Sequence, residues 1–149
     1  MAGLDAHTKV LLHFDGTFTK DECGNDWGVA FGTPLFTIGK FGQCAEFKSC
    51  SYLFDGNESD ITFNSADEWT IDFWTNFKSV SNDYLIFGRN RLGTPGSVID
   101  CTIEGQGLCI FHIAVIPLTS LTTNTWYHVA FVNDGTSFKT FLIEIGKFN

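Results

Sequence analysis

The chain has 149 residues, of which 44% are hydrophobic, and its 17 acidic and 9 basic residues give a formal charge of −8. This length fits one domain, residues 1–149, that is large enough to bury a core. The negative charge does not attract nucleic acid or an anionic membrane surface, so a cation or a neutral polar ligand is the expected partner.

Nothing in the sequence resembles a targeting signal or a membrane span. The start of the chain, Met1–Leu12, lacks a positively charged region followed by a long apolar stretch. No run approaches the roughly 18 apolar residues of a membrane-spanning helix. Any export would therefore depend on a longer parent chain or on a phage-like assembly route.

The composition favours strands over helices. The chain has 16 Phe, 4 Trp and 3 Tyr, which fit a half-buried pleated surface, and no segment keeps a helical period. Short segments that alternate or run apolar between turn residues predict strands, and no repeat or linker separates them. In chain order these are Val10–Phe14, Cys44–Lys48, Tyr52–Phe54, Trp69–Phe77, Tyr84–Phe87, Val98–Ile103, Leu108–Val115, Trp126–Val132 and Phe138–Ile145.

The loop after the first strand is crowded with carboxylates. In "LLHFDGTFTKDECGND", Leu11–Asp26, four acidic side chains lie close together with two glycines and Asn25. Such a loop can hold a cation, bind a sugar or turn the chain at a sheet edge. Asp and Asn also cap turns by bonding nearby backbone, so a turn role stays open beside a ligand role.

The segment "WTIDFWTNF", Trp69–Phe77, alternates between two faces. Its odd-numbered residues share one face, and Asp72 and Trp74 share the other. This division is typical of a strand that is buried on one face and partly exposed to solvent on the other. We nevertheless expect Trp69, Trp74 and Trp126 to be core or near-core residues, and His128, on the face of Trp126, to be a satisfied, half-buried imidazole.

The strongest local signal is "VNDGTS", an Asp-Gly pair between apolar strands. It predicts a type I′ turn at Asp134-Gly135, because both central residues of that turn need positive φ. In the predicted register Phe131 faces Phe138. Both faces of this hairpin carry bulky side chains, which suits a strand pair inside a two-sheet sandwich.

The five cysteines are an odd number without CxxC spacing, which favours thiols in a reducing cell over a disulfide framework. The best exception is a Cys101–Cys109 bridge, because these residues flank "TIEGQGL", a predicted hairpin tip. A zinc site is poorly supported, because the thiols are scattered and no His lies at ligand spacing from them.

Several blocks follow one another in an order typical of one family. They are "HTKVLLHFDGTFTKDECGN", "KFGQCAEFKSCSYL", "WTIDFWTNF" and "TNTWYHVAFVNDGTSFKTFL", and they cover most of the chain. Together they resemble laminin-G-like, concanavalin-A-like jelly-roll domains. The segments "DAHTKVLLHFDG" and "LTTNTWYHVAFV" are similar in sequence to domains in bacteriophage structural and tail-fibre proteins.

This resemblance implies an all-β, antiparallel two-sheet jelly-roll sandwich formed by residues 1–149. It also implies a noncatalytic carbohydrate-binding or adhesion module that contacts glycan, a host-surface component or other virion proteins through rim loops. The expected location is a virion assembled in the host cytoplasm, or an extracellular surface.

The resemblance also suggests residues for the opening loop. Family members often hold a cation on a rim loop, and the matching Asp-x-x-Gly-Asn pattern here makes Asp21 and Asn25 the first candidates for a weak calcium site, with Asp15 third. Asp26 and Trp27 are the candidate ligand-binding residues, since an indole can stack on the C–H face of a pyranose. Turn capping and core packing remain the alternatives.

Two other functions stay open. A structural decoration or assembly domain would bind no ligand. A glycoside hydrolase, which the concanavalin-like fold also supports, needs two carboxylates about 5–10 Å apart. Asp72 and Glu144 each stand alone in their strands, and no Gly-x-Ser-x-Gly motif occurs, so we expect no enzyme activity.

The end of the sequence predicts an open edge. The family pattern continues with further strands, whereas this sequence ends at "GKFN", just after Phe138–Ile145. We therefore expect the sandwich to lack the family's C-terminal strands. An unfilled position invites another chain to pair there, which predicts an oligomer through the Phe138–Ile145 edge.

Overall fold

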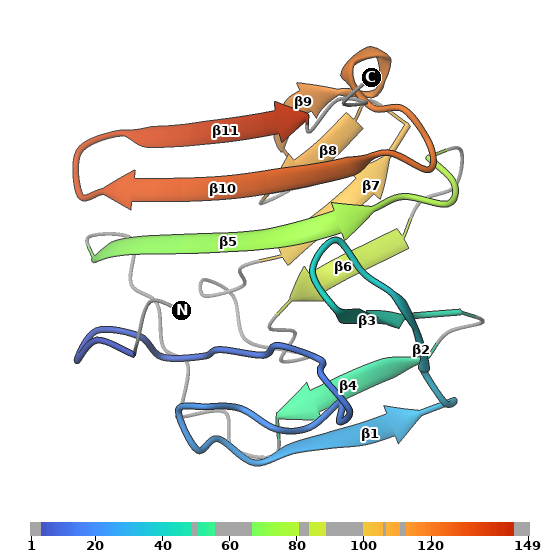
Figure 1. The fold of residues 1–149 in the computed structure, drawn as a ribbon. Helices are drawn as coiled ribbons and strands as arrows, with labels where there is room; N and C mark the ends of the chain where they lie inside the picture. The colour runs from blue at the N-terminus through green and yellow to red at the C-terminus, as the bar shows by residue number, and fades with distance from the viewer. Residues whose placement is uncertain are drawn as a thin grey trace. The chain divides into compact units, whose positions relative to one another are not determined.

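The computed structural model describes residues 4–48, 51–55, 67–80, 84–88, 100–105, 107–110 and 113–144 (Figure 1). These residues form an all-β chain of antiparallel sheets, as the sequence predicts. Within these ranges the one helical element is a short 3₁₀ turn, Leu118–Ser120. No helix of the described part is long and apolar enough to cross a membrane.

The chain divides into two compact units, Met1–Thr62 and Phe63–Asn149. We describe each unit by itself, and the single domain expected from the sequence stays a prediction. The strands of the first unit are β1 (Trp27–Phe31), β2 (Leu35–Ile38), β3 (Gln43–Glu46) and β4 (Tyr52–Asp55). Those of the second unit are β5 (Glu68–Asn76), β6 (Tyr84–Gly88), β7 (Asp100–Glu104), β8 (Gly107–Ile110), β9 (Ile113–Pro117), β10 (Trp126–Asp134) and β11 (Phe138–Glu144).

The first unit consists of two-stranded ribbons, β1 with β4 and β2 with β3. The predicted strand Val10–Phe14 is wrong: only Leu12 forms an isolated bridge, to Asp21. Phe14 has a φ of +59°, which ends the extended conformation, and the Asp21 carboxylate accepts the backbone N–H of Leu11 that a neighbouring strand would otherwise bind.

The second unit contains a sheet in the order β11-β10-β5 and a sheet in the order β6-β7-β8-β9. The Phe73 ring on β5 lies 5.5 Å from that of Phe87 on β6 and 6.3 Å from that of Phe131 on β10. Fully or almost fully buried side chains come from both sheets, including Cys101, Ile103, Leu108, Ile110, Tyr127, Val129 and Phe131. The two sheets therefore share one core, which is consistent with a β-sandwich.

One predicted strand of the second unit is two strands. The apolar run Leu108–Val115 is divided between β8 and β9, which pair with each other from Ile110 opposite Ile113. A continuous apolar run gives no sign of such a reversal, because it contains none of the Gly, Pro, Asn or Asp residues that mark turns.

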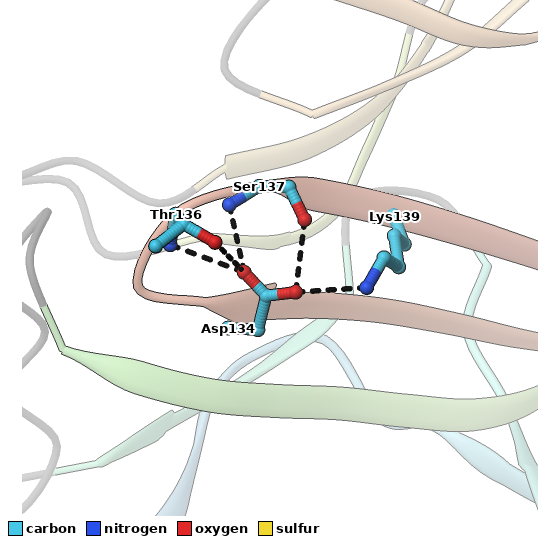
Figure 2. Close-up of polar contacts among 4 residues, drawn as sticks. All are labelled: Asp134, Thr136, Ser137 and Lys139. Atoms are coloured by element: carbon cyan, nitrogen blue, oxygen red, sulfur yellow. Dashed lines mark hydrogen bonds and ion pairs between the residues drawn. The ribbon is translucent and has the colours of Figure 1, made fainter.

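The β10–β11 hairpin exists, but its turn is not the predicted one. Asn133, not Phe131, lies opposite Phe138, and of the turn residues only Gly135 has positive φ. Figure 2 shows the reason: the Asp134 side chain accepts hydrogen bonds from the residues after it and so fixes the turn one residue later. The register slips by two residues, which leaves every side chain on its predicted face.

Candidate functional site

The Asp21 carboxylate is the centre of the opening loop. Asp21 is 7% exposed, and its Oδ1 accepts the backbone N–H groups of Leu11 and Cys23, each at 2.9 Å. Oδ2 accepts the indole N–H of Trp27 at 3.1 Å and a side-chain N–H of Asn25. The carboxylate thus joins two segments of the loop through four N–H donors.

The hydrogen bonds decide the charge state of Asp21. Burial alone would raise the pKa of this carboxyl group, but the bonds from the two backbone N–H groups, Asn25 and Trp27 outweigh burial and lower the pKa below its usual value. The group is therefore ionised at neutral pH, and its charge is satisfied by the surrounding donors.

The other predicted loop residues are distributed around this centre. The Asn25 amide also donates to the Lys9 carbonyl at 2.7 Å, so it serves as a donor to two oxygens. Asp15 lies elsewhere, where its Oδ1 accepts the backbone N–H of Gln43 at 3.2 Å. Asp26 is exposed. The structure therefore brings Asp21, Asn25 and Trp27 together and leaves Asp15 and Asp26 outside this group.

A carboxylate has about four acceptor positions, and N–H donors occupy those of Asp21. This geometry matches the turn-capping interpretation of the loop. Within the described ranges, no group of three or more His, Cys, Asp or Glu side chains is arranged to hold a metal ion. The calcium site remains a prediction.

A second group of polar and aromatic side chains lies on the face of the β11-β10-β5 sheet that points away from the core. Register pairs Trp74 on β5 with His128 on β10, and their rings stack with centroids 4.9 Å apart and planes 21° apart. The His128 Nε2 atom lies 2.9 Å from Oδ2 of Asp72. The side chain of Asp72 is 58% exposed, and that of His128 is 28% exposed.

Two exposed apolar side chains extend this outer face onto β11. Ile143 lies opposite His128 and is 54% exposed, and Phe141 lies opposite Ala130 and is 49% exposed. We call Asp72, Trp74, His128, Phe141 and Ile143 the outer-face cluster. It combines a stacked aromatic pair, a solvent-accessible carboxylate and an apolar margin.

The sequence shows part of this cluster. Alternation places Trp74 and Asp72 on the wet face of their strand, and it correctly predicts a half-buried, satisfied His128. The expectation that Trp74 is a core residue is wrong, because Trp74 lies on the face opposite Phe73, which packs against the core. The pairing of Trp74 with His128 depends on a contact between distant strands, which alternation does not reveal.

The cysteine geometry does not favour the suggested bridge. Cys101 lies opposite Ile110, and Cys109 lies opposite Thr102. Because neighbouring residues of a strand point to opposite faces, this register directs the two thiols away from each other. In the opening loop, burial and the nearby Asp21 charge raise the pKa of Cys23, so its thiol stays protonated at neutral pH.

No family model, curated protein or solved structure matches this chain. The similarity to laminin-G-like domains therefore remains an interpretation of the four sequence blocks.

Proposed function

We propose that this chain is a noncatalytic binding and adhesion module that contacts a glycan through its outer-face cluster. The observation that carries the proposal is the stacked Trp74–His128 pair beside the accessible Asp72 carboxylate. The sequence resemblance to phage structural and tail-fibre domains supports a location on a virion or another surface. We also propose that the strands of the two sheets are connected in jelly-roll order.

The chemistry of the cluster suits a neutral sugar. A pyranose has an apolar C–H face that stacks on an aromatic ring and hydroxyl groups that donate to a carboxylate. The cluster offers both on one surface, with Phe141 and Ile143 as an apolar margin. An acidic chain with a formal charge of −8 also repels anionic polymers, which favours a neutral or cationic ligand.

The spacing of carboxylates supports binding without hydrolysis. On this face of β5, the next carboxylate along the strand from Asp72 is Glu68, which pairs with Asp134. Four residues of strand span about 13 Å, more than the roughly 10 Å at which two carboxylates cooperate on a glycosidic bond. Asp72 moreover forms a hydrogen bond with His128.

A glycan array with the purified protein, with and without calcium, tests this proposal. We expect binding to a set of neutral glycans that is lost in Asp72→Ala and weakened in Phe141→Ser. Thr70→Ala is the matched control, because Thr70 lies exposed on the same face of β5, two residues from Asp72 along the strand. Binding that is equal in all four proteins, or absent from the parent, would contradict the proposal.

Assembly through β11 is the second candidate function, and a specific observation favours it. Among the described strands, β11 pairs only with β10 and forms an edge of its sheet. Its seven residue pairs run without a bulge, and Phe138, Phe141 and Ile143 are 40–54% exposed. A regular apolar edge of this kind is the type of strand that another chain extends.

Light scattering over a concentration series tests assembly. We expect an oligomer whose mass falls on dilution, because pairing at one edge strand buries little surface. A monomer at every concentration would rule out self-assembly through this edge and would leave the glycan proposal unaffected.

A further inference from the structure

The tripeptide Asp-Gly-Thr occurs twice among the described residues, at Asp15-Gly16-Thr17 and at Asp134-Gly135-Thr136. An aspartate isomerises more readily before glycine than before other residues, because glycine has no Cβ to hinder the reaction. We propose that Asp15 is a site of spontaneous isoaspartate formation and that Asp134, in the same local sequence, is protected by its hydrogen bonds.

Both oxygens of Asp134 are held (Figure 2). Oδ1 accepts the backbone N–H and the hydroxyl of Thr136 at 3.1 and 2.8 Å and the backbone N–H of Ser137 at 2.7 Å. Oδ2 accepts the Ser137 hydroxyl at 2.9 Å and the Lys139 ammonium group at 2.8 Å. These contacts, above all that of Lys139, lower the pKa of Asp134 far below its usual value.

Asp15 has a different environment. It is exposed, and its one hydrogen bond is the 3.2 Å contact from the Gln43 N–H to Oδ1. The backbone on both sides has positive φ, +59° at Phe14 and +78° at Gly16. The side chain is therefore held by one long contact, whereas that of Asp134 is held by five.

The reaction needs a mobile, protonated carboxyl group. The backbone nitrogen of the glycine attacks Cγ of the aspartate, a C–N bond forms, and the carboxyl OH leaves as water with the amide proton. Water then opens the five-membered ring at either carbonyl and yields aspartate or isoaspartate, so the mass is unchanged overall. Five contacts restrict the rotation of the Asp134 carboxyl group toward the Gly135 nitrogen, whereas one long contact holds that of Asp15.

Isomerisation would affect the opening loop. IsoAsp15 inserts a methylene group into the backbone between Phe14 and Gly16 and moves the carboxylate. The present fit is close, because a Cβ on Gly42 would lie 3.0 Å from Oδ1 of Asp15. We therefore expect the contact between Asp15 and Gln43 to be lost in the product.

Peptide mapping of protein aged at neutral pH and physiological temperature tests the inference. Electron-transfer fragmentation identifies isoaspartate in the tryptic peptide Val10–Lys20 and in the chymotryptic peptide Val132–Phe138. We expect isoaspartate to accumulate with time in the first peptide and not in the second. Asp15→Glu should abolish the first signal, because glutamate forms the larger ring much more slowly.

A double substitution, Ser137→Ala with Lys139→Ala, removes two of the side-chain contacts to Asp134, and we expect isoaspartate to appear there. In urea the parent protein should isomerise at both sites, because the two tripeptides are identical in sequence. Equal accumulation at Asp15 and Asp134 in the folded protein, or a difference between them that persists in urea, would overturn the inference.

Discussion

Replacing Asp21 by alanine tests the carboxylate's role as a structural acceptor. Of its four donors, Asn25 and Trp27 are half-buried side chains that can turn toward water, whereas the backbone N–H groups of Leu11 and Cys23 cannot. Each part-buried donor left without a partner costs about 1–3 kcal/mol, so we expect Asp21→Ala to lower the free energy of unfolding by about 2–6 kcal/mol. Asp21→Asn should cost less, because its remaining oxygen can keep the two backbone bonds.

Urea unfolding followed by tryptophan fluorescence measures this loss. Asp26→Ala is the matched control, because Asp26 is an exposed acidic residue of the same loop. If Asp21→Ala and Asp26→Ala unfold at the same urea concentration, the carboxylate does not hold the loop and the reasoning is refuted.

Calcium can be tested on the same proteins. An ion that binds only the folded state at a hundredfold excess over its Kd would stabilise it by about 2.7 kcal/mol. A melting temperature that is the same in millimolar calcium and in chelator would contradict the calcium prediction. A shift that is present in the parent and lost in Asp21→Ala would support it.

The stabilisation by Asp21 should also depend on pH. Burial favours the neutral form, but the hydrogen bonds outweigh burial and lower the pKa below the usual 3.8. A lowered pKa means that the stabilisation is present above the unfolded-state value and is lost as the pH falls through the folded-state value. The difference in unfolding free energy between the parent and Asp21→Asn should therefore narrow in acid below about pH 4.

Other predictions concern the second unit. Gly107→Ala should lower the free energy of unfolding, measured with urea, by more than 1 kcal/mol, because Gly107 has a φ of +150° and a Cβ would lie 2.1 Å from a backbone oxygen. Gly105→Ala is the control, because a Cβ there would meet no atom within 4 Å. Tyr127→Phe should cost about 1–2 kcal/mol, because the buried hydroxyl accepts a backbone N–H at 2.7 Å. NMR should find Asp134 ionised at about pH 3, where ordinary aspartates protonate, and Lys139→Ala should raise its pKa.

Strands with a clear two-residue alternation could be predicted from the sequence. β5, β10 and β11 lie within one or two residues of their predicted bounds, because their apolar side chains face one core. β1 and β2 were not predicted, since Gly28 interrupts the apolar residues of β1 and every residue of β2, Leu35–Ile38, is exposed. Alternation reports burial on one face, and strands without such a face do not show it.

The functional residues were predicted less well, because their roles depend on hydrogen bonds between distant segments. The predicted Asp21, Asn25 and Trp27 do lie together, yet the sequence does not show that Lys9 and Leu11 complete the group. Pairing of distant strands likewise creates the outer-face cluster. Residue types and local spacing identify candidates, and the register decides which of them meet.

The formal charge of −8 does not measure how many carboxylates can bind a cation. Asp21 and Asp134 accept hydrogen bonds at both carboxylate oxygens, so their lone pairs already have donors. For such a group a metal ion must replace several hydrogen bonds, whereas at an accessible carboxylate such as Asp72 a ligand hydroxyl needs only one open acceptor position. The hydrogen bonds, rather than the overall charge, therefore favour the proposed neutral ligand at the outer-face cluster over calcium at the opening loop.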